Sequence, residues 1–409
     1  MASPRVQAFA ENLKKFNIDP VIFTRHWNGN ENEWTDFLKD NHHQPSVTEN
    51  KMFTVYRLPY HANSKFEKNS TITKPLRKLY HFINPAIGKF NLEVNAYKCF
   101  YNFLNNHLAK NHYDVIIISA PPFNTVRLGH ELAAKFNIPL VLDLRDIWQG
   151  LLVPENSTPD FKTKYFLYFN RRYARKWFAS AKLITTVSEP LAQEIKSVTG
   201  KQAKVITNGF EEKFFSQLQP KHKNQLFNFT VVGTIYPKQD IQILIKGLKK
   251  FKALHSIEKM QLNFIGLKSL TEVAKNIEES LQDFKMLITG KIPRQEALQF
   301  LADAHILFYS GWKGHKGIYS TKIFEYLGAR KNILIAPGDD DVIDELLDIT
   351  KAGNVANSPD EFCNHLSNAY RQWETNGTIT YFGIEKEILK YSRENQTEKF
   401  AKEILNAIS

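Results

Sequence analysis

The sequence predicts an α/β protein built from two doubly wound parallel sheets, and three observations support this. Short continuous apolar runs, which are typical of strands covered on both faces, alternate with longer helical stretches. The alternation occurs in two series, separated by the polar and aperiodic segment Phe214–Asn228. A length of 409 residues, at roughly 150 residues per domain, predicts two or three domains.

The first series supplies four strands and three helices. The predicted strands are Val115–Ser119, Pro139–Leu144, Leu183–Val187 and Lys204–Thr207. The helices between them fall near Thr125–Phe136, Thr163–Ala179 and Pro190–Val198. Strand–helix–strand repetition of this kind builds a Rossmann-like domain.

The beginning of the chain departs from this pattern. A Rossmann-like domain opens with a strand and a glycine-containing turn, but residues 5–16 already have the pattern of a first helix and Val21–Thr24 that of a second strand. We therefore expect the first strand and its turn to be missing because Met1 is an internal methionine. The alternative is a natural variant with a shorter sheet.

The second series predicts another Rossmann-like domain. Its strands are Phe229–Gly233, Leu262–Gly266, Met286–Gly290, Ile306–Tyr309 and Asn332–Ala336. Its helices fall near Ile241–Leu254, Arg294–Ala302, Ser320–Ala329 and Val342–Leu347, and Glu385–Ile408 is a final helical stretch. We predict domains at 1–213 and 214–384, with the helix of residues 385–409 returning to the first domain.

Charge and cysteine content limit the function classes. The chain has 54 Lys and Arg against 42 Asp and Glu, a net charge of +12, which attracts nucleic acid, acidic lipid headgroups or phosphorylated small molecules. The alternative is a solvated basic surface. Two cysteines, Cys99 and Cys363, exclude a disulfide framework and a thiolate zinc cluster and suit a reducing compartment.

The sequence predicts no membrane-spanning helix, because its longest apolar run, Tyr165–Phe169, falls far short of the roughly 20 residues required. We expect a cytoplasmic protein, with contact at the inner face of the plasma membrane as an option. Two basic aromatic stretches, Phe161–Lys182 and Lys65–Lys98, suit an anionic bilayer. The alternative for the first is a core-facing aromatic stripe with a solvated basic face.

A candidate anion site lies at the start of the predicted helix Ser320–Ala329. Ser320 or Thr321 is a natural N-cap, and the free N–H groups that follow favour phosphate. Lys322 is unfavourable in the first turn of a bare helix and becomes reasonable beside an anion. Glu325, one turn on, could accept hydrogen bonds from a ribose diol. The alternative is a capped surface helix.

Charged residues also follow a strand of the first domain. Asp143, Arg145 and Asp146 crowd the carboxyl end of the run Pro139–Leu144, and that edge of an open α/β sheet faces the ligand. Asp146 is the better candidate for accepting a proton from an acceptor hydroxyl. Trp148 could stack on a sugar or simply pack. A structural Asp–Arg pair is the alternative for the whole group.

Several segments, taken together, resemble the GT-B glycosyltransferases of family four, a retaining group. Thr321–Ala336 (TKIFEYLGARKNILIA) resembles the family's K-x-x-E-Y-L segment. The other segments that resemble it are Val205–Phe210, Val187–Glu189, Asp143–Trp148, Phe229–Tyr236 and Gly290–Ala304. The resemblance covers essentially the whole chain from Arg5, and the D-x-R-D-x-W of Asp143–Trp148 is found in envelope-polysaccharide members.

The resemblance implies two Rossmann-like domains facing a cleft, and transfer of a sugar from a nucleotide diphosphate sugar to a glycan or lipid-linked acceptor with retention. Glu325 would hold the ribose, and Arg5 would reach towards the phosphates from the acceptor side, with Arg145 and Trp148. The donor-binding residues that it implies are Gly233, Thr234, Gly290, Lys291, Ile292, Tyr319, Ser320, Thr321 and Lys322.

Two departures from the family pattern bear on catalysis. Gly317 stands where the family has the first glutamate of its Glu-x7-Glu motif, which contacts the sugar. Thr234 and Gln239 stand where relatives carry an Arg and a Lys for the diphosphate. Because the leaving diphosphate gains charge, we expect Lys238 and Lys322 to stabilise it, without a metal or a further cofactor.

Three other functions remain open from the sequence. A GT-B nucleotide-sugar epimerase would need extra catalytic acids in the cleft. A catalytically impaired sugar-nucleotide-binding or scaffold protein is favoured by Gly317 and by the missing first turn. A nucleic-acid binder rests on the net charge alone and lacks a recognition motif, so we expect no specific nucleic-acid partner.

Overall fold

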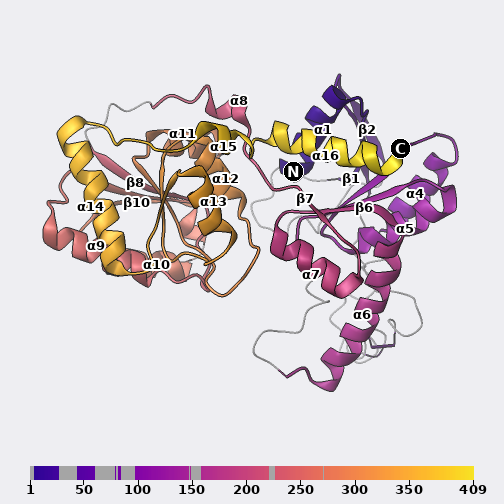
Figure 1. Cartoon of the computed structure of the whole chain (residues 1–409), viewed down its shortest axis with the longest axis horizontal. Helices are drawn as coiled ribbons and strands as arrows, with labels where there is room; N and C mark the ends of the chain where they lie inside the picture. Colours follow the sequence, from indigo (N-terminus) through magenta and orange to yellow (C-terminus); the bar gives the residue numbers. More distant parts are fainter. Residues whose placement is uncertain are drawn as a thin grey trace. The chain divides into compact units, whose positions relative to one another are not determined.

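The computed structural model describes residues 4–26, 44–59, 79, 82–83, 97–146, 148, 158–220, 226–269 and 271–409. The chain divides into two compact units, drawn in Figure 1. The first comprises residues 1–206 and 397–409, and the second comprises Thr207–Gln396. The boundaries predicted from the sequence were 213/214 and 384/385. The observed boundaries differ because Phe210, Phe215 and Ile388 are buried in the core of the second unit.

The first unit contains a parallel sheet of four strands in the order β4-β5-β6-β7. The strands are β4 (Ile116–Ala120), β5 (Leu140–Leu144), β6 (Ala181–Thr186) and β7 (Lys204–Val205). The helices α5 (Asn124–Phe136), α6 (Phe161–Ala179) and α7 (Glu189–Thr199) connect them. All five residues of β5 are buried, including Asp143, and the other four are apolar, as in a strand covered on both faces. This sheet agrees with the prediction.

A second, three-stranded sheet of the first unit has the order β1-β3-β2. Its strands are β1 (Val21–Arg25), β2 (Ser46–Glu49) and β3 (Thr54–Leu58), and helices α1 (Pro4–Asn12), η1 (Leu13–Phe16) and α4 (Lys98–Leu108) lie in the same unit. The helix α1 and strand β1 were predicted. The strand β2 was not, because all four of its side chains are exposed and it lacks an apolar run.

The last helix, α16 (Arg393–Ile408), enters the first unit from Thr397 onward. There Phe400 stacks on Phe9 of α1 with ring centroids 4.4 Å apart. Both rings are buried with Val141 of β5 in one apolar cluster. The predicted return of the C-terminal helix to the first domain is confirmed.

The second unit is built on a parallel six-stranded sheet in the order β10-β9-β8-β11-β12-β13. The strands are β8 (Phe227–Val232), β9 (Met260–Ile265), β10 (Lys285–Ile288), β11 (Ile306–Tyr309), β12 (Asn332–Ile335) and β13 (Gly353–Val355). The helices are α8 (Glu212–Phe215), α9 (Gln242–Leu254), η5 (Leu267–Ser269), α10 (Thr271–Ser280), α11 (Arg294–Asp303), α12 (Thr321–Gly328), α13 (Val342–Thr350), α14 (Pro359–Asn376) and α15 (Glu385–Leu389).

This strand order identifies where a ligand would bind in the second unit. The chain lays down β8, β9 and β10 outward in one direction and then returns to place β11, β12 and β13 on the other side of β8. The order reverses between β8 and β11, as in a dinucleotide-binding sheet. In open sheets of this kind, ligands bind beyond the carboxyl ends of the strands at that reversal.

Candidate functional site

The turn after β8 lies at the reversal point and brings a glycine against a lysine. Gly233 has φ +93, and a Cβ built there would lie 2.9 Å from Cε of Lys322. Gly266, after the neighbouring strand β9, also has a positive φ of +90, and its Cβ would lie 3.5 Å from Cα of Gly233. The turns after β8 and β9 therefore place two glycines next to each other, and the side chain of Lys322 lies against the first of them.

Lys322 reaches this turn from the first turn of α12. Ser320 is the N-cap of that helix, and its side chain accepts a hydrogen bond from the N–H of Lys322 at 3.3 Å. The Nζ of Lys322 donates to the backbone oxygen of Thr234. Burial lowers the pKa of Lys322 to about 8. Among the described residues no carboxylate forms an ion pair with it, so an anion at the helix start would supply the missing charge.

Glu325 lies one turn further along α12 and is paired. Its Oε1 is 3.6 Å from Nη2 of Arg294, which also lies 3.4 Å from Oε1 of Glu211. Burial raises the pKa of Glu325, and the positive charges of Arg294 and Arg393 oppose that rise. Arg294 therefore orients the carboxylate of Glu325, and a bound ribose would share that carboxylate with Arg294.

Tyr326 holds the reversal point together, a role that the sequence analysis did not assign. Its Oη accepts a hydrogen bond from the N–H of Val232 at 2.9 Å and donates to the oxygen of Phe308 at 3.2 Å. One buried hydroxyl therefore bridges the ends of β8 and β11. The signal for this role was the tyrosine after Glu325 in the EYL sequence, which reads as apolar core when only helical periodicity is considered.

The other predicted donor-binding residues lie around the same edge of the sheet. Gly290 follows β10, where Thr289 accepts a hydrogen bond from Gly266 N–H at 3.1 Å and donates to Gly290 O at 2.9 Å. The side chain of Lys291 is exposed, and those of Ile292 and Tyr319 are half-buried. Thr321 is exposed at the start of α12.

Lys238 and Gln239 differ in their surroundings. Gln239 is buried and structural: its Nε2 donates to Ser310 O at 2.5 Å, and its Oε1 accepts from Tyr236 N–H at 2.9 Å. Lys238 is exposed and makes no hydrogen bond or ion pair with a described residue. The structure thus joins Lys322 to the Gly233 turn and leaves Lys238 outside that contact.

The departure at Gly317 has a structural basis. Gly317 has φ +75, a conformation that a glutamate would adopt only under strain, and it is buried. Its N–H donates to the carboxylate of Asp341, just before α13. The loop after β11 is therefore tied to the start of α13 at the position where the family places its sugar-binding acid.

Arg5 and Asp143 form a closed network in the first unit. Arg5 Nη2 lies 2.8 Å from Asp143 Oδ1, and Ser119 and Thr185 donate to the same carboxylate at 3.1 and 2.9 Å. Burial acts to raise the pKa of Asp143, but Arg5 and the two hydroxyls hold it below its ordinary value. Asp143 is therefore in a structural Asp–Arg pair, but its partner is Arg5 and not Arg145, the arginine of the predicted group.

Arg145, Asp146 and Trp148 lie beyond the end of β5. Arg145 donates from Nη2 to Pro121 O at 2.6 Å, while its buried Nε has no hydrogen-bond partner among the described residues. Asp146 is exposed; partial desolvation raises its pKa, against the pull of Arg145. The ring of Trp148 stacks between Phe123 and Trp177, with centroids 5.9 and 6.0 Å away. Its packing alternative fits this arrangement, because both neighbours cover the faces that a sugar would need.

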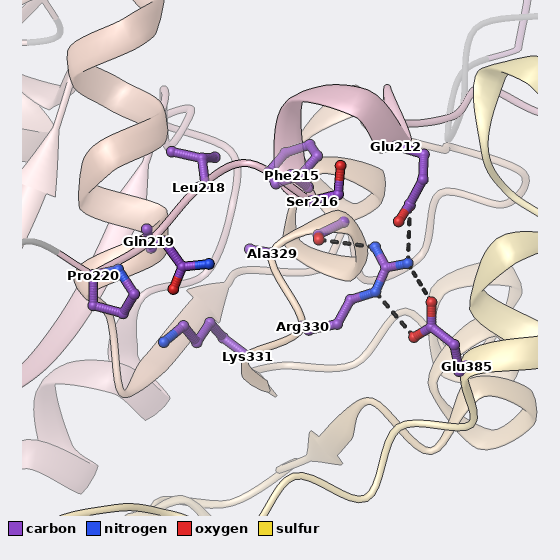
Figure 2. Close-up of a pocket in the computed structure, with 12 residues that line it drawn as sticks. Glu212, Phe215, Ser216, Leu218, Gln219, Pro220, Ala329, Arg330, Lys331 and Glu385 are labelled. Carbon is purple, nitrogen blue, oxygen red and sulfur yellow. Dashed lines mark hydrogen bonds and ion pairs between the residues drawn. The ribbon is translucent and has the colours of Figure 1, made fainter.

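A separate cavity of about 410 Å³ lies at the opposite end of α12. Figure 2 shows Arg330 at its wall, with hydrogen bonds to Glu212 and Glu385. Arg330 and Lys331 immediately precede β12, so this cavity is at the amino end of the sheet. It is not at the edge where the strand order predicts a ligand.

The described part of the chain contains neither a membrane-spanning helix nor a metal-binding cluster of side chains. No helix there is both long and apolar enough to cross a bilayer. No three His, Cys, Asp or Glu side chains gather there as a metal site. Of the second basic aromatic stretch, Lys65–Lys98, all but residues 79, 82, 83, 97 and 98 lie outside the described residues.

Comparison with known proteins shows similarity in structure only. No family model and no curated protein matches the sequence. Sucrose-phosphate synthase from Thermosynechococcus elongatus is similar with a TM-score of 0.62 and 14% identity, covering 99% of this chain and 93% of that one.

Two other solved structures are also similar. A trehalose-phosphate synthase (UDP-forming) from Burkholderia xenovorans, in complex with glucose-6-phosphate, has a TM-score of 0.60 at 10% identity, covering 99% of this chain and 96% of its own. Anabaena HepE, in complex with UDP-glucose, has a TM-score of 0.53 at 15% identity, covering 75% and 82%. These similarities support GT-B architecture without supporting family four. The chain therefore has the predicted GT-B fold, with two doubly wound α/β units.

Proposed function

We propose that this protein transfers a sugar from a nucleotide diphosphate sugar to a glycan or lipid-linked acceptor, with retention of configuration. The observation that carries the proposal is Lys322, a half-buried cation lying across the Gly233 turn at the start of α12. It lies at the reversal of strand order, where such sheets bind nucleotides. The nucleotide diphosphate is the class of ligand that supplies both its missing negative charge and a ribose for Glu325.

The second unit would stabilise the leaving group. As the bond between the anomeric carbon and the phosphate oxygen breaks, negative charge grows on the diphosphate, and we expect Lys322 and the positive end of the α12 helix dipole to stabilise it. Lys238, exposed on the neighbouring loop, could add a second cation. The proposal requires no cofactor other than the donor itself.

The first unit would serve the acceptor. In the proposed reaction the acceptor oxygen forms a bond to the anomeric carbon, the donor phosphate leaves, and the hydroxyl proton passes to a base. Asp146 is the candidate base, because it is exposed while Asp143 is fully committed to Arg5. The similarity to a structure that holds UDP-glucose supports a nucleotide sugar as the donor.

Nucleotide binding is tested by thermal shift with UDP, GDP and other nucleoside diphosphates. A ligand at about 100 times its Kd should stabilise the protein by about 2.7 kcal/mol. Lys322→Met and Glu325→Gln should remove the shift. Matched controls are Lys331→Met, a half-buried lysine at the other end of the same helix, and Glu278→Gln on α10, and both should retain it.

Turnover separates the proposed transferase from its alternatives. Release of UDP or GDP on addition of acceptor, with loss of the acceptor hydroxyl, supports transfer. Interconversion of the free nucleotide sugar would instead indicate the epimerase. Tight nucleotide binding with no release under any acceptor would favour a binding or scaffold protein, the function that Gly317 in place of an acid favours.

A further inference from the structure

In the described part of the first unit, helix α6 has one face that is exposed, although Arg175 on this face donates from Nε to Val198 O at 2.9 Å. The buried residues of the helix are Leu167, Ala174, Trp177 and Phe178. On the opposite side, spacings of three and four residues align a stripe that we call the α6 face: Phe161, Lys164, Tyr168, Arg172 and Arg175. All five are exposed, and Phe161 and Tyr168 retain 78% and 60% of their accessible surface.

The charge of this helix has a single sign. The sequence of α6 contains six Lys or Arg residues and no Asp or Glu. Lys164 and Arg172 make no hydrogen bond or ion pair with any described residue. A surface helix that only interacts with water normally mixes both signs in i,i+4 pairs. The unpaired cations therefore indicate an anionic partner.

An apolar edge continues beside the α6 face. The ring of Phe82 stacks on Tyr165 with centroids 4.5 Å apart, and the hydroxyl of Tyr165 donates to Phe82 O at 2.7 Å. Phe82 and Ile83 remain 37% and 42% exposed. In Figure 1 the end of α6 that begins at Phe161 extends beyond the four-stranded sheet of its own unit. Cations and exposed apolar side chains thus occur together on a projecting element.

We propose that the α6 face docks the first unit onto a bilayer that contains anionic lipid. Lipid headgroups would take the charge of Lys164, Arg172 and Arg175, and the rings of Phe161 and Tyr168 would enter the boundary between headgroups and acyl chains. Nucleic acid would satisfy the cations but would leave the apolar edge of Phe82 and Ile83 in water. This inference is independent of the proposed enzymatic function.

The test is sedimentation of the full chain with lipid vesicles. Wild-type protein should bind vesicles of equal parts phosphatidylcholine and phosphatidylglycerol, and should not bind phosphatidylcholine alone. Because each cation near an anionic surface contributes about a fivefold change in partitioning, Lys164→Glu with Arg172→Glu should weaken binding at least tenfold. The control double variant Lys246→Glu with Lys249→Glu makes the same charge change on exposed residues of α9 and should bind normally.

Aromatic variants test insertion separately from charge. Phe161→Ser with Tyr168→Ser should abolish the binding that survives at high salt, where screening removes most surface attraction. The exposed Phe382, replaced by Ser, is the control and should change nothing. Melting curves verify that each variant is folded.

Three results would overturn the inference. One is binding to neutral and anionic vesicles alike or to neither. A second is equal loss of binding in the α9 control. The third is competition by RNA that removes the protein from vesicles and depends on the same α6 residues, which would make the face a nucleic-acid site.

Discussion

At the scale of single residues, the cations Arg5 and Lys322 differ in how their charge is met. Arg5 meets Asp143 at 2.8 Å with both side chains almost fully buried, so its charge is compensated within the first unit. Lys322 has only the backbone oxygen of Thr234 among the described residues. Desolvation penalises an unpaired buried charge, so Lys322 persists at a cost that a bound anion would remove. The paired residue is structural, and the unpaired one is the candidate for function.

Lys322 should make nucleotide affinity depend on pH. Its pKa of about 8 means that the free protein loses this charge as the pH rises, so affinity for a nucleoside diphosphate should fall about tenfold per pH unit above about 8. Calorimetric titration from about pH 7 to about pH 9.5 measures this, and Lys322→Met should bind weakly with a flat profile. A wild-type Kd that stays constant over this range would contradict the assignment.

The same lowered pKa has the opposite effect on the stability of the free protein. Between about pH 8 and the ordinary lysine pKa of 10.5, the unfolded chain binds the proton that the folded chain has lost. The free energy of unfolding should therefore rise with pH in that interval, relative to Lys322→Met.

Asp143→Asn should destabilise the first unit by about 3–5 kcal/mol, because it leaves Arg5 buried without a counter-charge. Arg5→Met combined with Asp143→Leu should recover most of that loss in urea unfolding, since neither charge then remains. The folded pKa of Asp143 is below its ordinary 3.8, so the contribution of this group is present above that value and is lost as the pH falls through the folded pKa. If the effects of Arg5→Met alone and Asp143→Leu alone add up to the effect of the double variant, the two side chains are not coupled.

At the scale of elements, the candidate site is made where β8, β11 and α12 meet. The hydroxyl of Tyr326 joins the ends of β8 and β11, and the same helix carries Lys322 to the Gly233 turn. The helix therefore supplies both the candidate cation for a ligand and the link that positions the turn. A substitution in the Gly233 turn should therefore weaken nucleotide binding beyond what its effect on stability would explain.

Gly233→Ala tests this with a matched control. Its φ of +93 makes alanine unfavourable by roughly 1–2 kcal/mol, and the new Cβ would displace the flexible end of Lys322. Gly377 ends α14 with φ +71 and has nothing within 4 Å of a built Cβ, so Gly377→Ala should have a similar stability cost. Nucleotide Kd should rise at least tenfold in Gly233→Ala alone. Equal nucleotide affinity in Gly233→Ala and Gly377→Ala would show that the position of Lys322 does not depend on the Gly233 turn.

At the scale of the whole molecule, the chain passes between its two units twice, at 206/207 and 396/397. Within the second unit the two adjoining segments are tied to each other, because Phe210 N–H donates to Tyr391 O at 3.2 Å and Arg393 N–H donates to Phe210 O at 2.8 Å. Arg330 adds ion pairs to Glu212 at 2.9 Å and to Glu385 at 2.6 Å (Figure 2). One guanidinium thus anchors both segments on the sheet of this unit.

Arg330→Met should lower the free energy of unfolding of the second unit by about 1–2 kcal/mol, and Arg330→Lys should restore less than half, because an ammonium cannot reproduce the two-carboxylate fork. Lys351→Met is the control. Lys351 has the same φ of +51 but pairs with Asp348 at an exposed site, so its loss should be within about 0.5 kcal/mol. Hydrogen exchange should also quicken at 208–216 and 385–392 only in the Arg330 variants. Equal effects in Arg330 and Lys351 variants would contradict the anchoring role.

The sequence alone determined the elements that depend on local pattern. Buried parallel strands such as β11 are continuous apolar runs, and the capped start of α12 is visible from Ser320 and its neighbours, so both were predictable. The exposed strand β2 was missed because its pairing, and not its composition, makes it a strand. The role of Tyr326 was missed for a related reason, since its partners Val232 and Phe308 lie 94 and 18 residues away.

Only the tertiary structure decided which charged side chains meet. From the sequence, Arg5 and Lys322 were both candidates for contact with the donor phosphates, but Arg5 is paired with an aspartate 138 residues away, whereas Lys322 contacts no carboxylate among the described residues. The two α/β units follow from periodicity, which is a local property of the chain. The balance between a buried charge and its partner depends on distances across the folded chain, and no local pattern encodes it.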